Sequence, residues 1–296
     1  MSKSEKIELV IEALKRRGRP SSDQSWPDGQ PDYVAEYELT AEHIPALISL
    51  ASTWVKVDSD DDAVYSQVHA WRALGQLRAA EAVQPLLDHQ QELDDLDDDW
   101  YLEDFHLVFG LIGPPAIDEL TTFLKDTSNT QFPRGKAASG LAEIAIRFPE
   151  SRQQVIEILT DLLSRHDKTQ AELNGHLVWD LMNLNAVEAA ESIERAFAAN
   201  VIDPTVAGDW GDVRHELGIE GLGLAPERTP GWLTIAERIG IAQKPGGKTR
   251  ANAAVTAARK QQQRIQDQRK LKESKERARA KRKEQKKSRK RNRKAR

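Results

Sequence analysis

Apolar residues recur at helical spacing in four segments of the chain. These segments are Ala70-Trp-Arg-Ala-Leu-Gly-Gln-Leu77, Phe105-His-Leu-Val-Phe-Gly-Leu-Ile112, Ala137-Ala-Ser-Gly-Leu-Ala-Glu-Ile144 and Leu177-Val-Trp-Asp-Leu-Met-Asn-Leu184. In each segment the first, fifth and eighth residues are apolar, which places them on one face of an α-helix. The last residues of successive segments are 35, 32 and 40 positions apart. The pattern therefore predicts a helix that is repeated four times.

A second apolar pattern with helical spacing follows each of these segments after a short break. The second patterns cover residues 81–87, 116–124, 151–163 and 187–197. Pro114 and Pro115 can open a helix, because first-turn amides have no partner within the helix. Pro85 lies inside its predicted helix, where we expect it to kink or restart the helix. The repeated unit is thus a pair of helices.

Earlier in the chain, residues 4–17 and 40–51 read as further helices, the first ended by Gly18 and the second begun by Thr40. No stretch alternates between apolar and polar residues over a strand's length, so we expect no sheet. Helix pairs of about 30–45 residues that cover one another's apolar faces form an α-solenoid. The sequence therefore predicts an all-α fold of stacked antiparallel helix pairs.

One column of the repeat is small in three of its four copies. It contains Gly75, Gly110, Ala142 and Met182. Glycine inside a helix costs about 1 kcal/mol relative to alanine, so a compensating reason is expected. We predict that these positions let a neighbouring helix approach closely.

Two segments carry a family resemblance. His69-Ala-Trp-Arg-Ala-Leu-Gly-Gln-Leu-Arg-Ala-Ala-Glu-Ala-Val-Gln-Pro-Leu-Leu87 and Phe109-Gly-Leu-Ile-Gly-Pro-Pro-Ala-Ile117 resemble HEAT repeats of the phycobilisome (PBS) lyase type. With Ala207-Gly-Asp-Trp-Gly-Asp-Val213, they resemble bacterial HEAT-like repeat proteins of undefined activity, over roughly residues 37–217. The resemblance implies a HEAT-like α-solenoid with a binding or scaffold role. The alternative that it implies is a lyase-related or chromophore-handling accessory protein. The third repeat departs from the pattern, because Glu143-Ile-Ala-Ile-Arg-Phe-Pro149 replaces the glycine-containing turn and its spacing is irregular.

Charge divides the chain into an acidic body and a basic tail. Residues 244–296 contain 23 Lys and Arg and four acidic residues, a net charge of +19, whereas residues 1–243 carry −23. Such asymmetry is typical of an interaction tail on a globular body. We divide the chain into an N-terminal helix and polar linker (1–36), a HEAT-like repeat domain (37–242) and a basic low-complexity tail (243–296), which is helical or disordered.

The end of the tail is a polybasic run that predicts binding to RNA, ribosome or DNA without sequence preference. It has no aromatic residue for base stacking, so its affinity would come from the release of counterions. Two alternatives are docking on the acidic body and a contribution to solubility alone. The predicted nucleic-acid-binding residues are Arg277, Arg279, Lys281, Arg282, Lys283, Lys286, Lys287, Arg289, Lys290, Arg291, Arg293 and Lys294.

A polar column precedes the repeat's apolar positions. His69, Asp104, Lys136 and His176 each lie eight residues before the end of their segment. The column is either one line of a binding surface or a set of polar residues that face water at the starts of helices. We expect Trp71, Trp100, Trp179, Trp210 and Trp232 to be core residues rather than the lining of a groove. Residues 207–224, rich in glycine, are expected to cap the C-terminal end of the stack.

Two acidic stretches, residues 58–62 and 94–99, are expected to be solvated loops or to attract a basic partner. The first has aspartates at EF-hand spacing, but Ala63 and His69 stand where a calcium loop needs glycine and glutamate. Gly246-Gly-Lys-Thr249 lacks the first glycine of a phosphate-binding loop and reads as a flexible junction.

Catalytic, cofactor and metal residues are not predicted. The chain has no cysteine, no nucleophile elbow and no metal-binding histidine pair. We expect no signal peptide and no membrane span, and hence a cytoplasmic protein. The sequence therefore favours a binding scaffold over an enzyme, with an unidentified protein partner on the acidic body and nucleic acid or ribosome on the tail.

Overall fold

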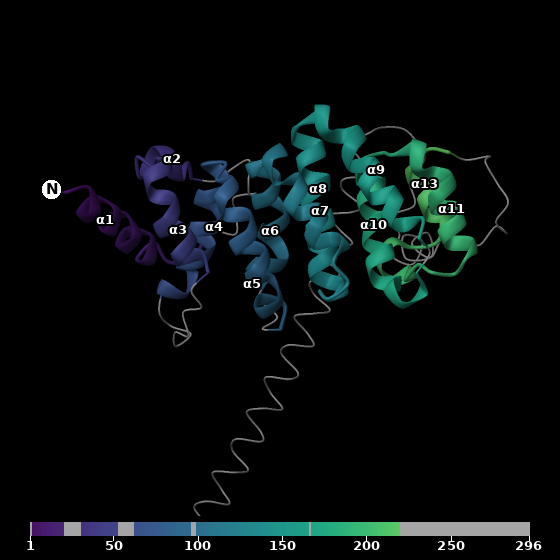
Figure 1. Ribbon diagram of the computed structural model, residues 1–296, viewed down its shortest axis with the longest axis horizontal. Coiled ribbons are helices and arrows are strands. Elements are labelled where there is room, and N and C mark those ends of the chain that lie inside the picture. Colours follow the sequence, from purple (N-terminus) through teal and green to yellow (C-terminus); the bar gives the residue numbers. More distant parts are fainter. Residues whose placement is uncertain (1, 21–30, 53–61, 96–98, 166, 220–296) are drawn as a thin grey trace, which may run out of the picture. The chain divides into compact units, whose positions relative to one another are not determined.

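The computed structural model describes residues 2–20, 31–52, 62–95, 99–165 and 167–219. These residues form helices and connecting turns, with no β-strand among them, which confirms the all-α prediction for this part of the chain (Figure 1). The basic tail, including residues 277–294, lies outside the described residues, as do Gly246–Thr249, Trp232 and most of the two acidic stretches. The proposed boundaries at residues 36 and 242 remain predictions.

The helices follow one another along the chain in two alternating rows. We call α2, α4, α6, α8, α10 and α12 the first-helix row, and α3, α5, α7, α9, α11 and α13 the second-helix row. Neighbours within the first-helix row pack against one another, and α3, α7 and α9 pack on α4, α8 and α10. The α-helices are α1 (Lys3–Lys15), α2 (Tyr33–Glu36), α3 (Ile44–Ala51), α4 (Ser66–Gln76), α5 (Val83–Asp95), α6 (Asp99–Ile112), α7 (Ile117–Lys125), α8 (Gln131–Arg147), α9 (Arg152–Leu163), α10 (Ala171–Asn183), α11 (Ala190–Ala198), α12 (Pro204–Ala207) and α13 (Trp210–Glu216).

Short 3-10 helices lead into several of these helices. The turn from the first helix to the second of a pair is entered by Arg78, Gly113 or Asn185, each with a positive φ, at 53°, 87° and 48°. The third pair differs, because Phe148 has a φ of −125° there, in line with its divergent sequence. The 3-10 helices are η1 (Ala41–His43), η2 (Asp62–Tyr65), η3 (Ala80–Ala82), η4 (Pro114–Ala116), η5 (Pro149–Ser151), η6 (Lys168–Gln170) and η7 (Val187–Ala189).

The prolines named in the sequence analysis all lie at the starts of helices. Pro114 and Pro115 open η4, as expected. Pro85 lies in the first turn of α5, which begins at Val83 after η3. The helix therefore restarts just before this proline, and no amide within the helix loses a partner.

The apolar columns of the repeat form the core. Their members are buried, except for Leu77, which is half-buried. Buried aromatic rings meet edge to face beside them: Trp71 lies 4.8 Å from the column residue Phe105, and Phe105 lies 5.8 Å from Phe109, measured between ring centroids. Trp71 and Trp210 are core residues as expected, whereas Trp100 and Trp179 are half-buried.

The two glycines of the small column allow the close helix contacts that we predict for them. A Cβ atom on Gly110 would lie 2.6 Å from Cβ of Glu143 in α8, closer than such atoms approach in proteins. A Cβ atom on Gly75 would lie 3.2 Å from Cδ1 of Leu111 in α6. The spacing between α4, α6 and α8 therefore depends on these two glycines.

A repeated loop motif, Asp-x-Ser/Thr, precedes α8, α10 and α12. Oδ1 of Asp126, Asp167 and Asp203 accepts a hydrogen bond from the backbone N–H two residues later and another from that residue's hydroxyl. Such aspartate turns fix the backbone locally and end one helix pair before the next begins.

Short helices lie at both ends of the described stack. The N-terminal helix α1 packs on α3 and α4. At the other end α12 packs on α10 and α13 packs on α11, with Trp210 and Val213 buried. Residues 207–219 of the predicted cap therefore include a helix that packs on α11, whereas residues 220–224 lie outside the described residues.

Candidate functional site

The polar column of the repeat lies along the first-helix row. His69 and Asp104 are buried, with 1% and 2% of their surface exposed, and Lys136 and His176 are half-buried. His69 and Asp104 therefore do not face water, whereas Lys136 and His176 do so in part. The reason is the close packing of the first helices, which encloses positions that would be open on an isolated helix pair.

At the N-terminal end, His69 links three segments. Nδ1 of His69 lies 2.7 Å from the Tyr33 hydroxyl, and Nε2 lies 2.8 Å from the carbonyl oxygen of Gly18. Because a carbonyl can only accept, Nε2 carries the proton and Nδ1 accepts from Tyr33. Burial lowers the pKa of His69 to about 4, so the imidazole is neutral at neutral pH.

An arginine lies beside this cluster. The Arg17 guanidinium carbon is 5.1 Å from the ring centroid of Tyr33 and 5.4 Å from that of Tyr37, and Arg17 also pairs with Glu36. These contacts attach the segment after α1 to α2, through charge and through the faces of two aromatic rings.

A buried ion pair joins α4 to α6. Nε of Arg72 lies 2.7 Å from Oδ2 of Asp104, and Nη2 lies 3.2 Å from Oδ1. Both side chains are 3% exposed. The two parallel contacts match the fork of a guanidinium to a carboxylate, and they place a compensated charge pair inside the stack.

Polar contacts of a different kind join α6 to α8 and α8 to α10. Nζ of Lys136 donates to the carbonyl oxygen of Leu102 at 2.7 Å. The Ser139 hydroxyl lies 3.1 Å from both carboxyl oxygens of Asp180.

Burial raises the pKa of Asp180 to about 8, and the Ser139 hydrogen bond and the Lys136 charge offset this rise only in part. Asp180 is therefore a protonated carboxyl at neutral pH.

His176 occupies the same junction in α10. Burial lowers its pKa to about 4, and the nearby Lys136 charge acts in the same direction. The imidazole meets the Phe132 ring edge to face, with 5.7 Å between centroids. It also lies so close to α8 that a Cβ atom on Gly135 would be 2.8 Å from Cδ2 of His176. This histidine fills space between helices rather than facing a ligand.

Taken together, a directed polar contact crosses each junction of the first-helix row from α2 to α10. Apolar contacts do not fix direction, whereas hydrogen bonds and ion pairs do. These directed contacts thus fix the register of neighbouring helices. Within the described residues, no group of three or more His, Asp or Glu side chains could hold a metal ion.

The polar column predicted from the sequence contains one member of the contacts at His69, Asp104 and Lys136, but neither member of the contact between Ser139 and Asp180. Arg72, Ser139, Asp180 and Tyr33 were not predicted. Arg72 did carry a signal, because a charged residue inside the apolar run Ala70-Trp-Arg-Ala-Leu74 must be paired when the run is buried. The pairing of Ser139 with Asp180 depends on the offset between α8 and α10, which the repeat spacing of 40 residues did not reveal.

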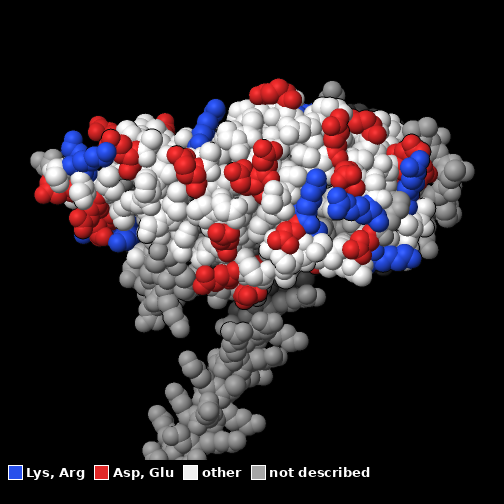
Figure 2. Space-filling view, viewed as in Figure 1, with Lys and Arg blue, Asp and Glu red and all other residues white. Residues whose placement is uncertain are grey.

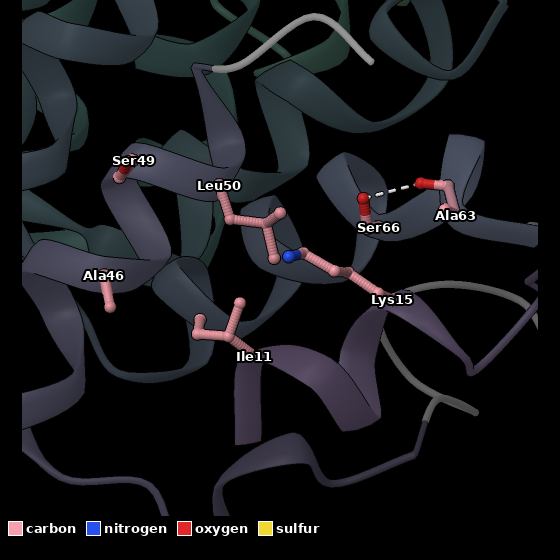
Figure 3. A pocket seen from close by; sticks show the side chains of 7 residues that line it. All are labelled: Ile11, Lys15, Ala46, Ser49, Leu50, Ala63 and Ser66. Carbon is pink, nitrogen blue, oxygen red and sulfur yellow. Dashed lines mark hydrogen bonds between the residues drawn. The ribbon is translucent and has the colours of Figure 1, made fainter. Parts of the chain in front are cut away.

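Two shallow hollows in the surface of the described part are lined by residues from several helices. The first, about 500 Å³, lies between α1, α3 and the start of α4. Figure 3 shows the side chains of Ile11, Leu50 and Lys15 facing one another there. It is a mostly apolar gap beneath the N-terminal helix.

The second hollow, about 530 Å³, is more polar. We call it the edge groove, because it lies where α5 ends and where α6, α8 and α10 begin. It is lined by Asp94, Leu102, Thr130, Gln131, Phe132 and Glu172. Two carboxylates and one aromatic ring thus share one open groove.

No single described helix is long and apolar enough to cross a membrane. Residues 100–112 and 114–125 have the length and composition of a span only when taken together, and the two helices are bent by 110° at the break between them.

The described part of the chain defines an all-helical protein whose helices pack against one another. The chain belongs to the DUF1186 family, described as "Protein of unknown function", which matches residues 35–221. This range begins within α2 and ends just beyond α13, so it includes the whole two-row stack from α3 onward and excludes α1. No curated protein and no solved structure matches the chain. The family match does not bear on the resemblance to PBS lyase repeats, which remains a prediction.

Proposed function

We propose that this chain is a non-enzymatic binding scaffold of the HEAT-like α-solenoid type, acting in the cytoplasm. In this proposal the acidic body holds a protein partner and the polybasic tail attaches the complex to RNA, ribosome or DNA. The observation that carries the proposal is that residues of the polar column make contacts between helices and not with a ligand site on the surface. His69, Asp104 and Lys136 of this column make contacts between helices. The surfaces left for function are therefore the acidic outer faces.

Charge supports this division of roles. The body carries −23 and the tail +19. Figure 2 shows acidic side chains along the whole length of one face of the described part, with fewer basic ones. Nucleic acid is repelled by such a face, whereas closely spaced Lys and Arg bind its phosphates. A protein partner with basic groups is the ligand that an acidic surface favours.

A titration of labelled, generic single-stranded RNA by fluorescence anisotropy tests the tether. The variant replaces the twelve predicted tail residues with glutamine in the full chain, and its circular dichroism serves as the folding control. We expect the variant to lose most of its affinity, because fewer counterions are released from the RNA on binding when lysine and arginine residues are removed. Equal binding by the variant and the parent chain would refute the tether.

A further inference from the structure

A buried carboxyl without a cationic partner lies at the junction of α8 and α10. Asp180 is 2% exposed and forms no ion pair with any described residue. It is hydrogen-bonded to the Ser139 hydroxyl, which lies 3.1 Å from both carboxyl oxygens. A hydroxyl carries one proton, so it cannot donate to both oxygens at once. An ionised Asp180 would therefore keep most of its acceptor sites unfilled inside the protein, which is costly.

The junction of α4 and α6 is built differently. There the buried carboxyl of Asp104 receives two parallel contacts from the Arg72 guanidinium, so each ion compensates the other. Ser139 occupies the same repeat position as Arg72, the third residue of its segment. A hydroxyl thus stands where the earlier repeat has a guanidinium. A neutral carboxylic acid suits this partner better than a carboxylate, because the acid can donate its own proton to the Ser139 oxygen.

Charged groups of α8 and α10 do not neutralise Asp180. Burial raises the pKa of Asp180 to about 8, while the charge of Lys136 in α8 acts against this rise and that of Glu143 in α8 adds to it. His176 lies one turn earlier in α10, and its own burial lowers its pKa to about 4. This imidazole is therefore neutral at neutral pH and supplies no positive charge.

The other elements that pack on α10 bring no cation to Asp180. From α9, Arg152 donates to the carbonyl oxygen of Leu184 at 3.0 Å and pairs with Glu188 at 2.6 Å, at and beyond the C-terminal end of α10. Lys168 of η6 precedes the start of α10, and α12 has no titratable side chain. Among the described residues, the direct partner of Asp180 across the junction is thus the Ser139 hydroxyl.

The start of α10 is held to α8 by contacts that do not depend on pH. The Gln131 amide donates to the carbonyl oxygen of Thr169 and accepts from the amide of Leu173, both at 3.2 Å. The Arg134 guanidinium donates to Oε1 of Gln170 at 2.6 Å. Glutamine and backbone groups carry no charge, and arginine stays protonated. A change of pH therefore acts on the Asp180 end of this junction.

We infer that the junction of α8 and α10 is a pH-sensitive device, at which α10 to α13 separate from α8 when Asp180 gives up its proton. Opening brings the carboxyl into water, where it is ionised at neutral pH. Because the open state binds fewer protons, closure is favoured at low pH and weakens as pH rises. The equilibrium constant for opening increases about tenfold per pH unit until the pH approaches the pKa of the closed form. This inference concerns conformation and does not depend on the proposed binding role.

Hydrogen–deuterium exchange of the full-length chain and of Asp180→Asn, compared at the same pH, tests this device. Asparagine keeps the shape of the side chain but cannot ionise, and the comparison at one pH cancels the intrinsic pH dependence of amide exchange. From pH 6.5 to 8, exchange in α10 to α13 should increase about tenfold relative to the variant. Amides of α4 and α6, which flank the ion-paired junction, should keep one ratio at both pH values. An unchanged ratio in α10 to α13, or the same increase in every described helix, would overturn the inference.

Ser139→Ala is a second variant that tests the device without Asp180→Asn. The Ser139 hydrogen bond favours the ionised carboxylate, so its removal should raise the pKa of Asp180 further. Between pH 8 and 9 opening of the parent chain should level off, whereas exchange in α10 to α13 of the variant should increase severalfold relative to the parent chain. Circular dichroism at pH 6.5 confirms that the variant is folded. Levelling off at the same pH in both proteins would show that Asp180 does not control the opening.

Discussion

At the scale of single residues, the buried ion pair between Arg72 and Asp104 is where a single substitution should affect stability most. Arg72 and Asp104 are both almost fully enclosed, so each charge depends on the other. Removing one partner of such a pair leaves an uncompensated buried charge, whereas replacing both with apolar residues of similar volume is much less costly.

We therefore expect Asp104→Asn to lower the free energy of unfolding by about 3–5 kcal/mol. The double variant Arg72→Met with Asp104→Leu should recover most of this loss. As a control, Arg165→Met breaks the exposed pair with Asp161, in which the side chains are 54% and 63% exposed, and should cost less than about 1 kcal/mol. Urea denaturation measures all three, and a double variant as unstable as Asp104→Asn would contradict this account.

Three buried titratable groups predict how stability depends on pH. The pKa of Asp180 is raised in the folded state, so its contribution is present at low pH and is lost as pH rises toward about 8. The pKa values of His69 and His176 are lowered to about 4, so their contribution is present above about 6.5 and is lost as pH falls. Stability should therefore be greatest near pH 6.5.

The Asp180→Asn variant isolates one of these contributions. Between pH 6.5 and 8 the parent chain should lose about 1.5 kcal/mol of unfolding free energy relative to the variant, because the unfolded carboxyl is ionised and the folded one is not. The histidine contributions are common to both proteins and cancel in this comparison. Chemical denaturation at both pH values measures the difference, and parallel pH profiles for the two proteins would show that Asp180 is ionised when folded.

At the scale of elements, the close contact between α6 and α8 depends on the absence of a side chain at Gly110. Gly110→Ala gains about 1 kcal/mol in helix propensity, but its Cβ would meet Cβ of Glu143 at 2.6 Å. A clash with an atom next to the backbone forces the helices apart and typically costs about 1–3 kcal/mol. We therefore expect a net loss of stability.

Gly75→Ala is the matched comparison. Its nearest contact is Cδ1 of Leu111 at 3.2 Å, the end of a side chain that can move. It should be less destabilising than Gly110→Ala, and thermal unfolding followed by circular dichroism ranks the two. The reverse order would show that the helix spacing is set elsewhere.

Some elements could be predicted from the sequence, and others could not. The first helices and the small column were correctly predicted, because a period of 3.6 residues and a glycine at a crossing are local signals. The 3-10 turns and the positive φ of Arg78 and Asn185 carry no such signal, since neither residue is a glycine. The Asp-x-Ser/Thr turns before α8, α10 and α12 were visible in the sequence as a repeated pattern, but their meaning required the loop geometry.

At the scale of the whole molecule, the candidate site was harder to predict than the fold. The polar column was found as a set of positions, yet its burial was not, because burial depends on how closely the first helices approach one another. Likewise, the edge groove assembles Asp94, Phe132 and Glu172 from three helices far apart in sequence. Charge, in contrast, is a property of composition, and the division into an acidic body and a basic tail follows directly from the sequence.

This division of charge is the central claim for function, and the salt dependence of RNA binding tests it most directly. For single-stranded RNA the slope of log K against log salt concentration is about −0.7 for each phosphate neutralised. We predict a steep slope for the full-length chain, about −4 or steeper, corresponding to six or more contacts. The slope should become clearly shallower when the twelve tail residues are glutamine, because 11 of the 23 Lys and Arg in residues 244–296 then remain. A shallow slope for the full-length chain, or the same slope in both proteins, would contradict a tail that binds nucleic acid through charge.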